Sequence, residues 1–115
     1  MTIHRFEDLK VWQKAQDLAV LVYQNFSDIK DFGFRDQITR ASVSISNNIA
    51  EGFERSSNPD FKRFLYFSLA SNSELRSMLY LAERLEYIKR SLALEHIDET
   101  NEISKMLYAF IKSMK

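Results

Sequence analysis

The 115-residue sequence contains no cysteine, one proline and only two glycines. Without cysteine, the chain has no disulfide, no thiol nucleophile and no cysteine-ligated metal site. So few glycines and prolines leave little material for the tight turns of an all-β fold, which favours long helices. No apolar run approaches the roughly 18 residues needed to span a bilayer, and the N-terminus lacks the apolar core of a signal peptide. The sequence therefore predicts a cytoplasmic protein with no membrane segment.

An excess of charge is also missing, because 16 Lys and Arg residues balance 16 Asp and Glu residues. A chain of zero net charge has no general attraction for phosphate backbones, so any nucleic-acid site has to be a local patch. Apolar residues make up 45% of the chain and charged residues 28%, which is typical of a folded globular protein. The length suits a single domain over residues 1–115.

Patterns that identify catalytic or cofactor sites are missing as well. His4 and His96 lie near opposite termini, and two histidines without cysteine do not make a zinc-site pattern. Ser42, Ser44 and Ser46 lack the flanking glycines of a nucleophile elbow and a paired base. No glycine-rich phosphate loop or dinucleotide fingerprint is present. The sequence predicts a protein that is not an enzyme and that has no catalytic residue, metal or cofactor.

Four segments carry apolar residues at helical spacing, and they predict helices over about residues 7–30, 35–56, 59–88 and 95–114. The third segment opens with a cap residue, a proline at the first helical position and an acid near the positive helix end, at Asn58, Pro59 and Asp60. Short connections between long helices predict an all-α fold, an up-down antiparallel four-helix bundle.

The second segment contains the least ordinary stretch, residues 37–55, which reads QITRASVSISNNIAEGFER. Its centre alternates apolar and polar residues like a strand, but a helical wheel places its apolar residues on one side. Eight residues of low helix propensity cost about 4 kcal/mol relative to alanine. Burial of Ile38, Ile45 and Ile49 returns about 1.5–3 kcal/mol each. The stretch is therefore predicted to be an interior helix that its neighbours stabilise.

The same wheel places six polar residues in one row, called here the polar ridge: Gln37, Arg40, Ser44, Asn48, Glu51 and Arg55. One interpretation is a site in which the two arginines bind a phosphate or carboxylate and Asn48 and Glu51 orient it. The other is a hydrogen-bonded network against another subunit or against the third helix, where Glu74 or Arg76 could pair. Such rows often specify helix register.

The third predicted helix has a second face opposite its core stripe, called here the tyrosine face: Lys62, Tyr66, Leu69, Ser73, Arg76, Tyr80, Arg84 and Tyr87. Interleaved aromatic and basic residues suit stacking on single-stranded nucleic acid. Tyr and Arg are also enriched in protein–protein interfaces. The neutral chain and the presence of Leu69 favour a subunit contact, and a third interpretation is scattered surface tyrosines with hydrated hydroxyls.

Two motifs resemble the four-helix-bundle family of 23S ribosomal-RNA intervening-sequence proteins: Phe6-x-x-Leu9-x-Val11-Trp12-Gln13 and Gln37-Ile38-x-Arg40-Ala41-x-x-Ser44-Ile45-x-x-Asn48-Ile49-Ala50-Glu51-Gly52. The resemblance covers nearly the whole chain and weakens after about residue 90. It implies a bacterial protein that assembles into a ring-like homopentamer and has no known enzymatic activity. It also implies a glycine directly before Tyr87, where this chain has Glu86.

These observations predict a non-enzymatic, homo-oligomeric helical-bundle protein that acts as a scaffold or interaction module. The alternative is an accessory protein that binds ribosomal or other structured RNA, or DNA, as a ring-shaped oligomer. In that case Arg76 and Arg84, or Arg40 and Arg55, would be presented around the ring. One relative of this kind works with a reverse transcriptase and nucleic acid, but it is strongly basic, whereas this chain is neutral.

Overall fold

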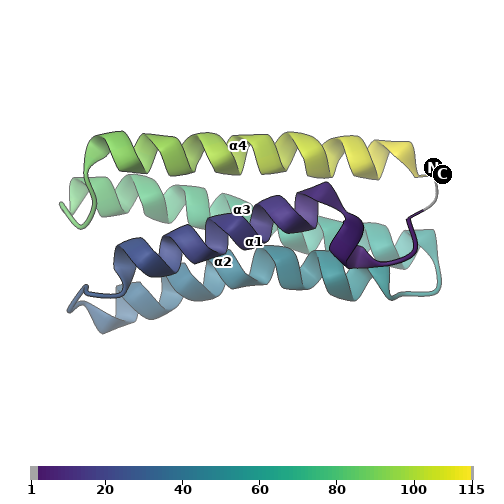
Figure 1. Ribbon diagram of the computed structural model, residues 1–115, viewed down its shortest axis with the longest axis horizontal. Coiled ribbons are helices and arrows are strands. Elements are labelled where there is room, and N and C mark those ends of the chain that lie inside the picture. Colours follow the sequence, from purple (N-terminus) through teal and green to yellow (C-terminus); the bar gives the residue numbers. More distant parts are fainter. Residues whose placement is uncertain (1–2, 115) are drawn as a thin grey trace.

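A computed structural model describes residues 3–114, and within that range the protein contains four long helices and no strand (Figure 1). The helices are α1 (Lys10–Phe26), α2 (Phe32–Phe53), α3 (Asn58–Arg84) and α4 (Arg90–Ser113), preceded by a short 3-10 turn, η1 (Phe6–Asp8). Successive helices run in opposite directions in one body of 43 × 22 × 19 Å. The predicted all-α, up-down antiparallel four-helix bundle is confirmed.

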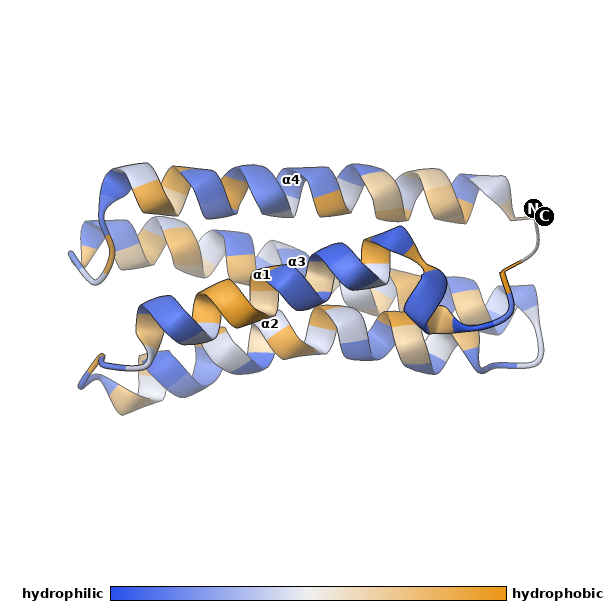
Figure 2. Cartoon of the chain, in the orientation of Figure 1, coloured by the Kyte–Doolittle hydropathy of each residue, from blue (hydrophilic) through white to orange (hydrophobic). Residues whose placement is uncertain are grey.

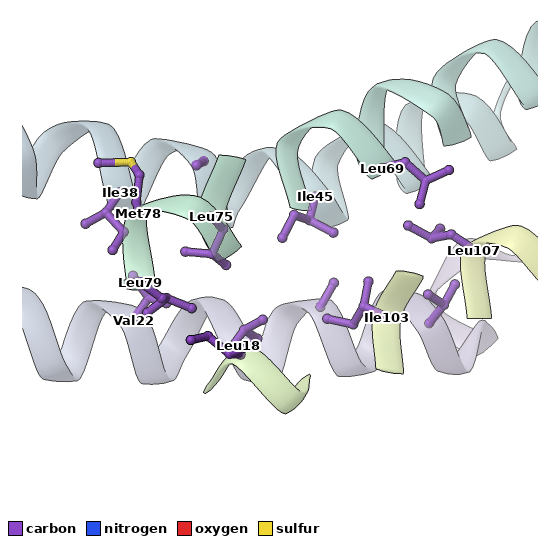
Figure 3. Close-up of a cluster of buried hydrophobic side chains, with 14 of the residues drawn as sticks. Leu18, Val22, Ile38, Ile45, Leu69, Leu75, Met78, Leu79, Ile103 and Leu107 are labelled. Atoms are coloured by element: carbon purple, nitrogen blue, oxygen red, sulfur yellow. The ribbon is translucent and has the colours of Figure 1, made fainter. Parts of the chain in front are cut away.

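The four apolar stripes meet in one core. Each helix is amphipathic, so apolar and polar bands alternate along its length (Figure 2). In the core, α1 and α2 contribute Leu18, Val22, Ile38 and Ile45, and α3 and α4 contribute Leu75, Leu79, Ile103 and Leu107 (Figure 3). All eight are almost fully buried. None of the helices in residues 3–114 is both long and apolar enough to cross a membrane.

The strand-like stretch is part of a continuous helix, as predicted. α2 begins at Phe32 because Asp31 Oδ1 accepts a hydrogen bond from the backbone N–H of Phe34 at 3.2 Å. The buried Ser42 satisfies its hydroxyl inside the helix, where Oγ donates to the carbonyl of Thr39 at 2.7 Å. A serine that bonds to its own helix can be buried without an unpaired donor. Ser42 can therefore lie on the core side of α2, beside buried isoleucines.

Buried and partly buried hydrogen bonds link the neighbouring helices near mid-bundle. Gln16 Nε2 of α1 donates to Ser46 Oγ of α2 at 2.9 Å. Ser68 Oγ of α3 donates to the carbonyl of Ile45 at 2.8 Å. Asn72 Nδ2 of α3 donates to the carbonyl of Thr100 at 2.7 Å and to Ser104 Oγ at 2.8 Å, both on α4. Directional bonds of this kind favour one register of the helices over others.

The helix ends differ from the sequence prediction. α1 spans Lys10–Phe26 instead of 7–30, because residues 6–8 form the separate 3-10 turn and Leu9 is extended. α2 starts and ends three residues earlier than 35–56, and Asp31 is the cap that sets its start. α4 begins at Arg90 instead of 95, because the buried Ala93 extends its apolar stripe by one turn.

α3 ends at Arg84, four residues before the predicted end at 88, in a turn built around Glu86. Glu86 has a φ of 62°, in the left-handed region that glycine adopts most readily. Its N–H donates to the carbonyl of Glu83 at 3.0 Å, and the N–H of Tyr87 donates to the carbonyl of Ala82 at 2.8 Å. These are the bonds of a Schellman motif, which commonly ends a helix with glycine. The backbone thus explains why the family resemblance implies glycine here.

α1 and α4 share the least extensive contact in the bundle. At this contact His96 is only 3% exposed, and its Nε2 lies 2.9 Å from Asn25 Nδ2. Nearby, Lys14 Nζ and Glu99 Oε2 form an ion pair at 2.9 Å. Burial lowers the pKa of His96, and the opposing effect of Glu95 and Glu99 is smaller. A neutral ring can accept the Asn25 hydrogen bond through Nε2, whereas a protonated ring cannot.

Gly52 gives the first test of the packing. A Cβ there would lie 2.7 Å from Phe64 Cβ and 2.9 Å from Phe61 Cδ1. We expect Gly52→Ala to lower the free energy of unfolding by about 1–3 kcal/mol, because the contact is too short for a methyl group. Gly33→Ala is the matched control, since the nearest atom to its Cβ is Asp31 Oδ1 at 3.9 Å, and it should be neutral or slightly stabilising. Urea denaturation followed by circular dichroism measures both, and equal effects would contradict the close approach.

His96 predicts a pH dependence of stability. Its pKa in the folded protein lies below its ordinary value of 6.5, so the unfolded chain binds the proton more readily. The neutral His96 ring therefore favours the folded state above about pH 6.5. This contribution to the free energy of unfolding is lost as the pH falls through the folded-state pKa. We expect the unfolding free energy to fall less between about pH 7 and about pH 5 in His96→Gln than in the unaltered protein. Identical urea-denaturation profiles across this range would show that the prediction is wrong.

Candidate interaction surfaces

The polar ridge lies along the seam between α2 and α3. Gln37 Nε2 donates to Glu74 Oε2 at 3.3 Å, and Ser71 Oγ donates to Ser44 Oγ at 2.9 Å. Asn48 Nδ2 turns back to the carbonyl of Ser44 at 2.8 Å and to its Oγ at 3.0 Å. These contacts are those of a hydrogen-bonded network between α2 and α3. Gln37 and Ser44 therefore bond across the seam, whereas Asn48 bonds within α2.

Arg76, one of the two expected partners of the ridge, is directed elsewhere. Its Nη1 donates to Asn101 Oδ1 of α4 at 2.8 Å, on the side of α3 away from the ridge. Glu74 is the residue of α3 that faces α2, and it pairs with Gln37 as the sequence suggested. The rotation of α3 about its own axis determines that Glu74 faces α2 and that Arg76 faces α4.

The two arginines of the ridge do not form one anion site. Arg55 lies past the end of α2, where its Nε is 3.8 Å from Asp60 Oδ2 and its guanidinium carbon lies 4.5 Å from the centre of the Phe64 ring. Arg40 is exposed and, within residues 3–114, forms no hydrogen bond or ion pair, and the same holds for Glu51. Arg40 and Arg55 are separated by about 20 Å along the helix direction. A two-arginine clamp on one phosphate is therefore not formed.

A groove of about 500 Å³ follows the seam at the N-terminal half of α2. It is lined by Gly33, Asp36, Gln37, Arg40, Ala41, Ser44, Ser71 and Glu74. Small side chains line part of it, and its charges are of both signs. No group of three or more His, Cys, Asp or Glu side chains in residues 3–114 is placed to hold a metal ion. The groove has the character of a polar contact surface, with Arg40 available to a partner.

Two members of the tyrosine face are not on it. Leu69 is only 6% exposed and lies in the core with Ile45 and Leu107 (Figure 3). It was expected to face outward, but α4 covers that side of α3. Tyr87 lies in the turn after α3, where its hydroxyl donates to Asp31 Oδ2 at 2.9 Å and its ring packs against Phe34. This hydrogen bond, with a smaller effect of burial, raises the pKa of Tyr87.

Of the remaining members, Tyr66 and Tyr80 are both more than half exposed and Ser73 and Arg84 are exposed beside them, as expected, whereas Arg76 is half-buried and bonds to Asn101 of α4. Lys62 is partly exposed.

The structure adds apolar residues that the sequence prediction missed: Phe67, Leu81 and Leu85. The heptad spacing of Phe67 and Leu81 keeps them on one side of a helix, and this signal was available in the sequence. We call Tyr66, Phe67, Tyr80, Leu81 and Leu85 together the α3 outer face.

Known proteins share this architecture. The family described as 23S rRNA-intervening sequence protein matches residues 7–109. The protein is also similar to a crystal structure of a protein of unknown function from the S23 ribosomal protein family of Bacteroides thetaiotaomicron VPI-5482. That likeness has a TM-score of 0.84 and 31% sequence identity, and it covers 90% of this chain and 99% of that chain. No curated protein matches the sequence.

The resemblance seen in the two motifs is therefore confirmed, and the family match extends to residue 109 in α4, beyond about residue 90, where the resemblance was expected to weaken. Ridge residues Gln37, Arg40 and Ser44 belong to the quoted motif and line the α2–α3 groove. The chain belongs to the family of 23S rRNA-intervening sequence proteins.

Proposed function

We propose that this protein is a non-enzymatic, self-associating helical bundle that serves as a cytoplasmic scaffold or interaction module. The observation that carries the proposal is the α3 outer face, whose five large side chains remain 44% to 53% exposed. α3 packs extensively against both α2 and α4, so this face is the side that the fold leaves uncovered. Clusters of exposed apolar side chains mark protein–protein contacts on soluble proteins.

The layout of the α3 outer face suits a helix from a second copy. Tyr66 and Phe67 form one apolar end, and Tyr80, Leu81 and Leu85 form the other, about 20 Å away along the helix. Between them the exposed residues include the small Ala70, Ser73 and Ser77, which allow a close approach of two helices. Aromatic residues in such positions often supply most of the binding energy of an interface. The homopentameric ring implied by the family resemblance belongs to this proposal.

Self-association is tested by light scattering after gel filtration at micromolar concentration. We expect the unaltered protein to be an oligomer. Tyr66→Glu with Tyr80→Glu should weaken its assembly at least about tenfold, because charges replace two rings that the proposed contact buries. Tyr23→Glu is the matched control, since Tyr23 of α1 is 51% exposed but lies away from α3. Circular dichroism should show that all three chains are equally helical. A monomeric unaltered protein would overturn the proposal.

A second candidate function, RNA or DNA binding, is supported by cations along α3 and α4. Within residues 3–114 five of them form no ion pair: Lys62, Arg76, Arg84, Lys105 and Lys112. Lys105 and Lys112 line a shallow groove together with the exposed Tyr108. Cations beside exposed aromatic rings can bind single strands by phosphate contact and stacking. Repetition around a ring would strengthen a patch that is weak in one copy.

This candidate is tested by retention of structured ribosomal RNA at a series of salt concentrations. We expect binding that weakens steeply with salt, with a slope that falls by about 0.7–0.9 for each phosphate contact removed. Lys62→Glu with Arg84→Glu should therefore lower both the affinity and the slope. The chain with Lys10→Glu and Lys30→Glu carries the same change of net charge outside this region and serves as control. Absence of retention at low salt would rule this function out.

A further inference from the structure

A groove of about 480 Å³ lies between α1 and α4, and we call it the α1–α4 groove. Its volume is in the range of sites that bind small molecules. It shares no residue with the polar ridge or with the α3 outer face, so the proposed self-association does not use it. Eight residues of the two helices line it: Leu21, Gln24, Asn25, Leu92, Glu95, His96, Asp98 and Glu99.

His96 is the one buried side chain among these eight, and its hydrogen bond fixes the state of its ring. Asn25 Nδ2 donates to the carbonyl of Leu21 at 2.8 Å and lies 2.9 Å from His96 Nε2. A carbonyl only accepts hydrogen bonds, so the amide presents its nitrogen on this side, and Nε2 accepts its second hydrogen. A neutral imidazole with an accepting Nε2 carries its proton on Nδ1.

The Nδ1–H group of His96 has no hydrogen-bond acceptor within residues 3–114. Among the side chains in this range that are not exposed, Asn72 Oδ1 is the only nitrogen or oxygen that is both unpaired and sealed from solvent. Nδ1 is unpaired but not sealed, so it opens to the groove that His96 lines. Polar groups in buried side chains are rarely left unpaired in folded proteins. A ligand atom that accepts a hydrogen bond would satisfy this donor.

Carboxylates surround the same groove. Glu95 and Asp98 are exposed and form no ion pair within residues 3–114. Glu99 pairs with Lys14 of α1 at 2.9 Å. Three carboxylates against one cation leave an excess of two negative charges, which disfavours an anionic ligand and attracts a cation. The acceptor that meets His96 therefore has to be a neutral group on a ligand whose charged group is positive.

The groove also has apolar surface on each of its two helices. Leu21 of α1 is 38% exposed, and Leu92 of α4 is half-buried. A short alkyl chain packed against them would remove apolar surface from water, which is favourable in proportion to the area buried. The groove thus matches a ligand with an apolar middle and two different polar ends.

We infer that the α1–α4 groove binds a small amino alcohol. Its ammonium group donates to Glu95 and Asp98, and its hydroxyl oxygen accepts from Nδ1–H of His96. Its alkyl chain packs against the two leucines. A simple amine leaves the histidine donor unpaired, and a diol leaves the carboxylates without a counter-charge. An amino acid would bring a carboxylate into an acidic groove.

The probe is aminobutanol, whose ammonium and hydroxyl groups lie at opposite ends of a short alkyl chain. It is titrated into the unaltered protein at about pH 7.5, where the ring is neutral because the pKa of His96 lies below its ordinary value of 6.5. Nuclear magnetic resonance follows the backbone amides and the His96 ring. We expect saturable shifts around the groove and, for so small a molecule, a dissociation constant in the millimolar range. Butylamine, which lacks the hydroxyl group, should bind about three- to tenfold more weakly.

Two variants separate the contributions of the two polar ends. Glu95→Gln with Asp98→Asn should weaken the binding of aminobutanol at least about threefold, because both free carboxylates are lost. Glu51→Gln with Glu102→Gln is the matched control, since it makes the same change of net charge at exposed residues outside the groove. In His96→Phe, aminobutanol and butylamine should bind equally. The carboxylate variant changes only exposed side chains, so it decides the question even if His96→Phe weakens the fold.

Shifts that do not saturate, or that lie outside the α1–α4 groove, would overturn the inference. Equal affinities of the unaltered protein for aminobutanol and butylamine would overturn it as well, because the histidine donor would then have no part in binding. Butanediol, which lacks the ammonium group, should not bind measurably, and an affinity equal to that of aminobutanol would contradict the role of the carboxylates. An equal loss of affinity in the control variant would show a general attraction of charges in place of a site.

Discussion

The packing of α2 against α3 is the constraint on which the rest of the bundle depends. α2 is rich in residues that disfavour a helix in isolation, so it is helical because Ile38, Ile45 and Ile49 are buried. Gly52 lies against Phe64 of α3, where no larger residue fits without movement. Once these two helices are in register, the polar ridge falls along their seam. The five side chains of the α3 outer face then remain about half exposed within residues 3–114.

Helical periodicity is the reason that the fold could be predicted from the sequence. The spacing of apolar residues in α2 outweighs its strand-like alternation, because the helical arc extends over many turns and the alternation over only a few residues. The helix ends depend on local geometry that periodicity does not contain. The turn at Glu86 is one example, since a glutamate in the left-handed region is not expected from propensity. The cap formed by Asp31 is another.

The candidate surfaces were predictable only in part. A wheel specifies which residues share a row, and the polar ridge is such a row. It does not specify how many neighbours cover a helix or how the helix is turned between them. Leu69 was assigned to an outward face for this reason, although α4 covers it, and Arg76 is directed to Asn101. Rows of polar or apolar residues on a helix can be interpreted only when the uncovered side of the helix is known.

The order of contacts around the bundle has a consequence for how the chain folds. α2 and α3 form a hairpin of adjacent helices with the most extensive contact, and α1 and α4 each pack mainly on one side of it. Contacts between sequence neighbours form quickly, because little loop entropy is lost before they are made. The hairpin is therefore the natural folding nucleus, and α1 and α4 are the natural last helices to dock. The contact between α1 and α4 completes the four-helix bundle. Because it is the least extensive contact, it is also the natural place for the native bundle to open transiently.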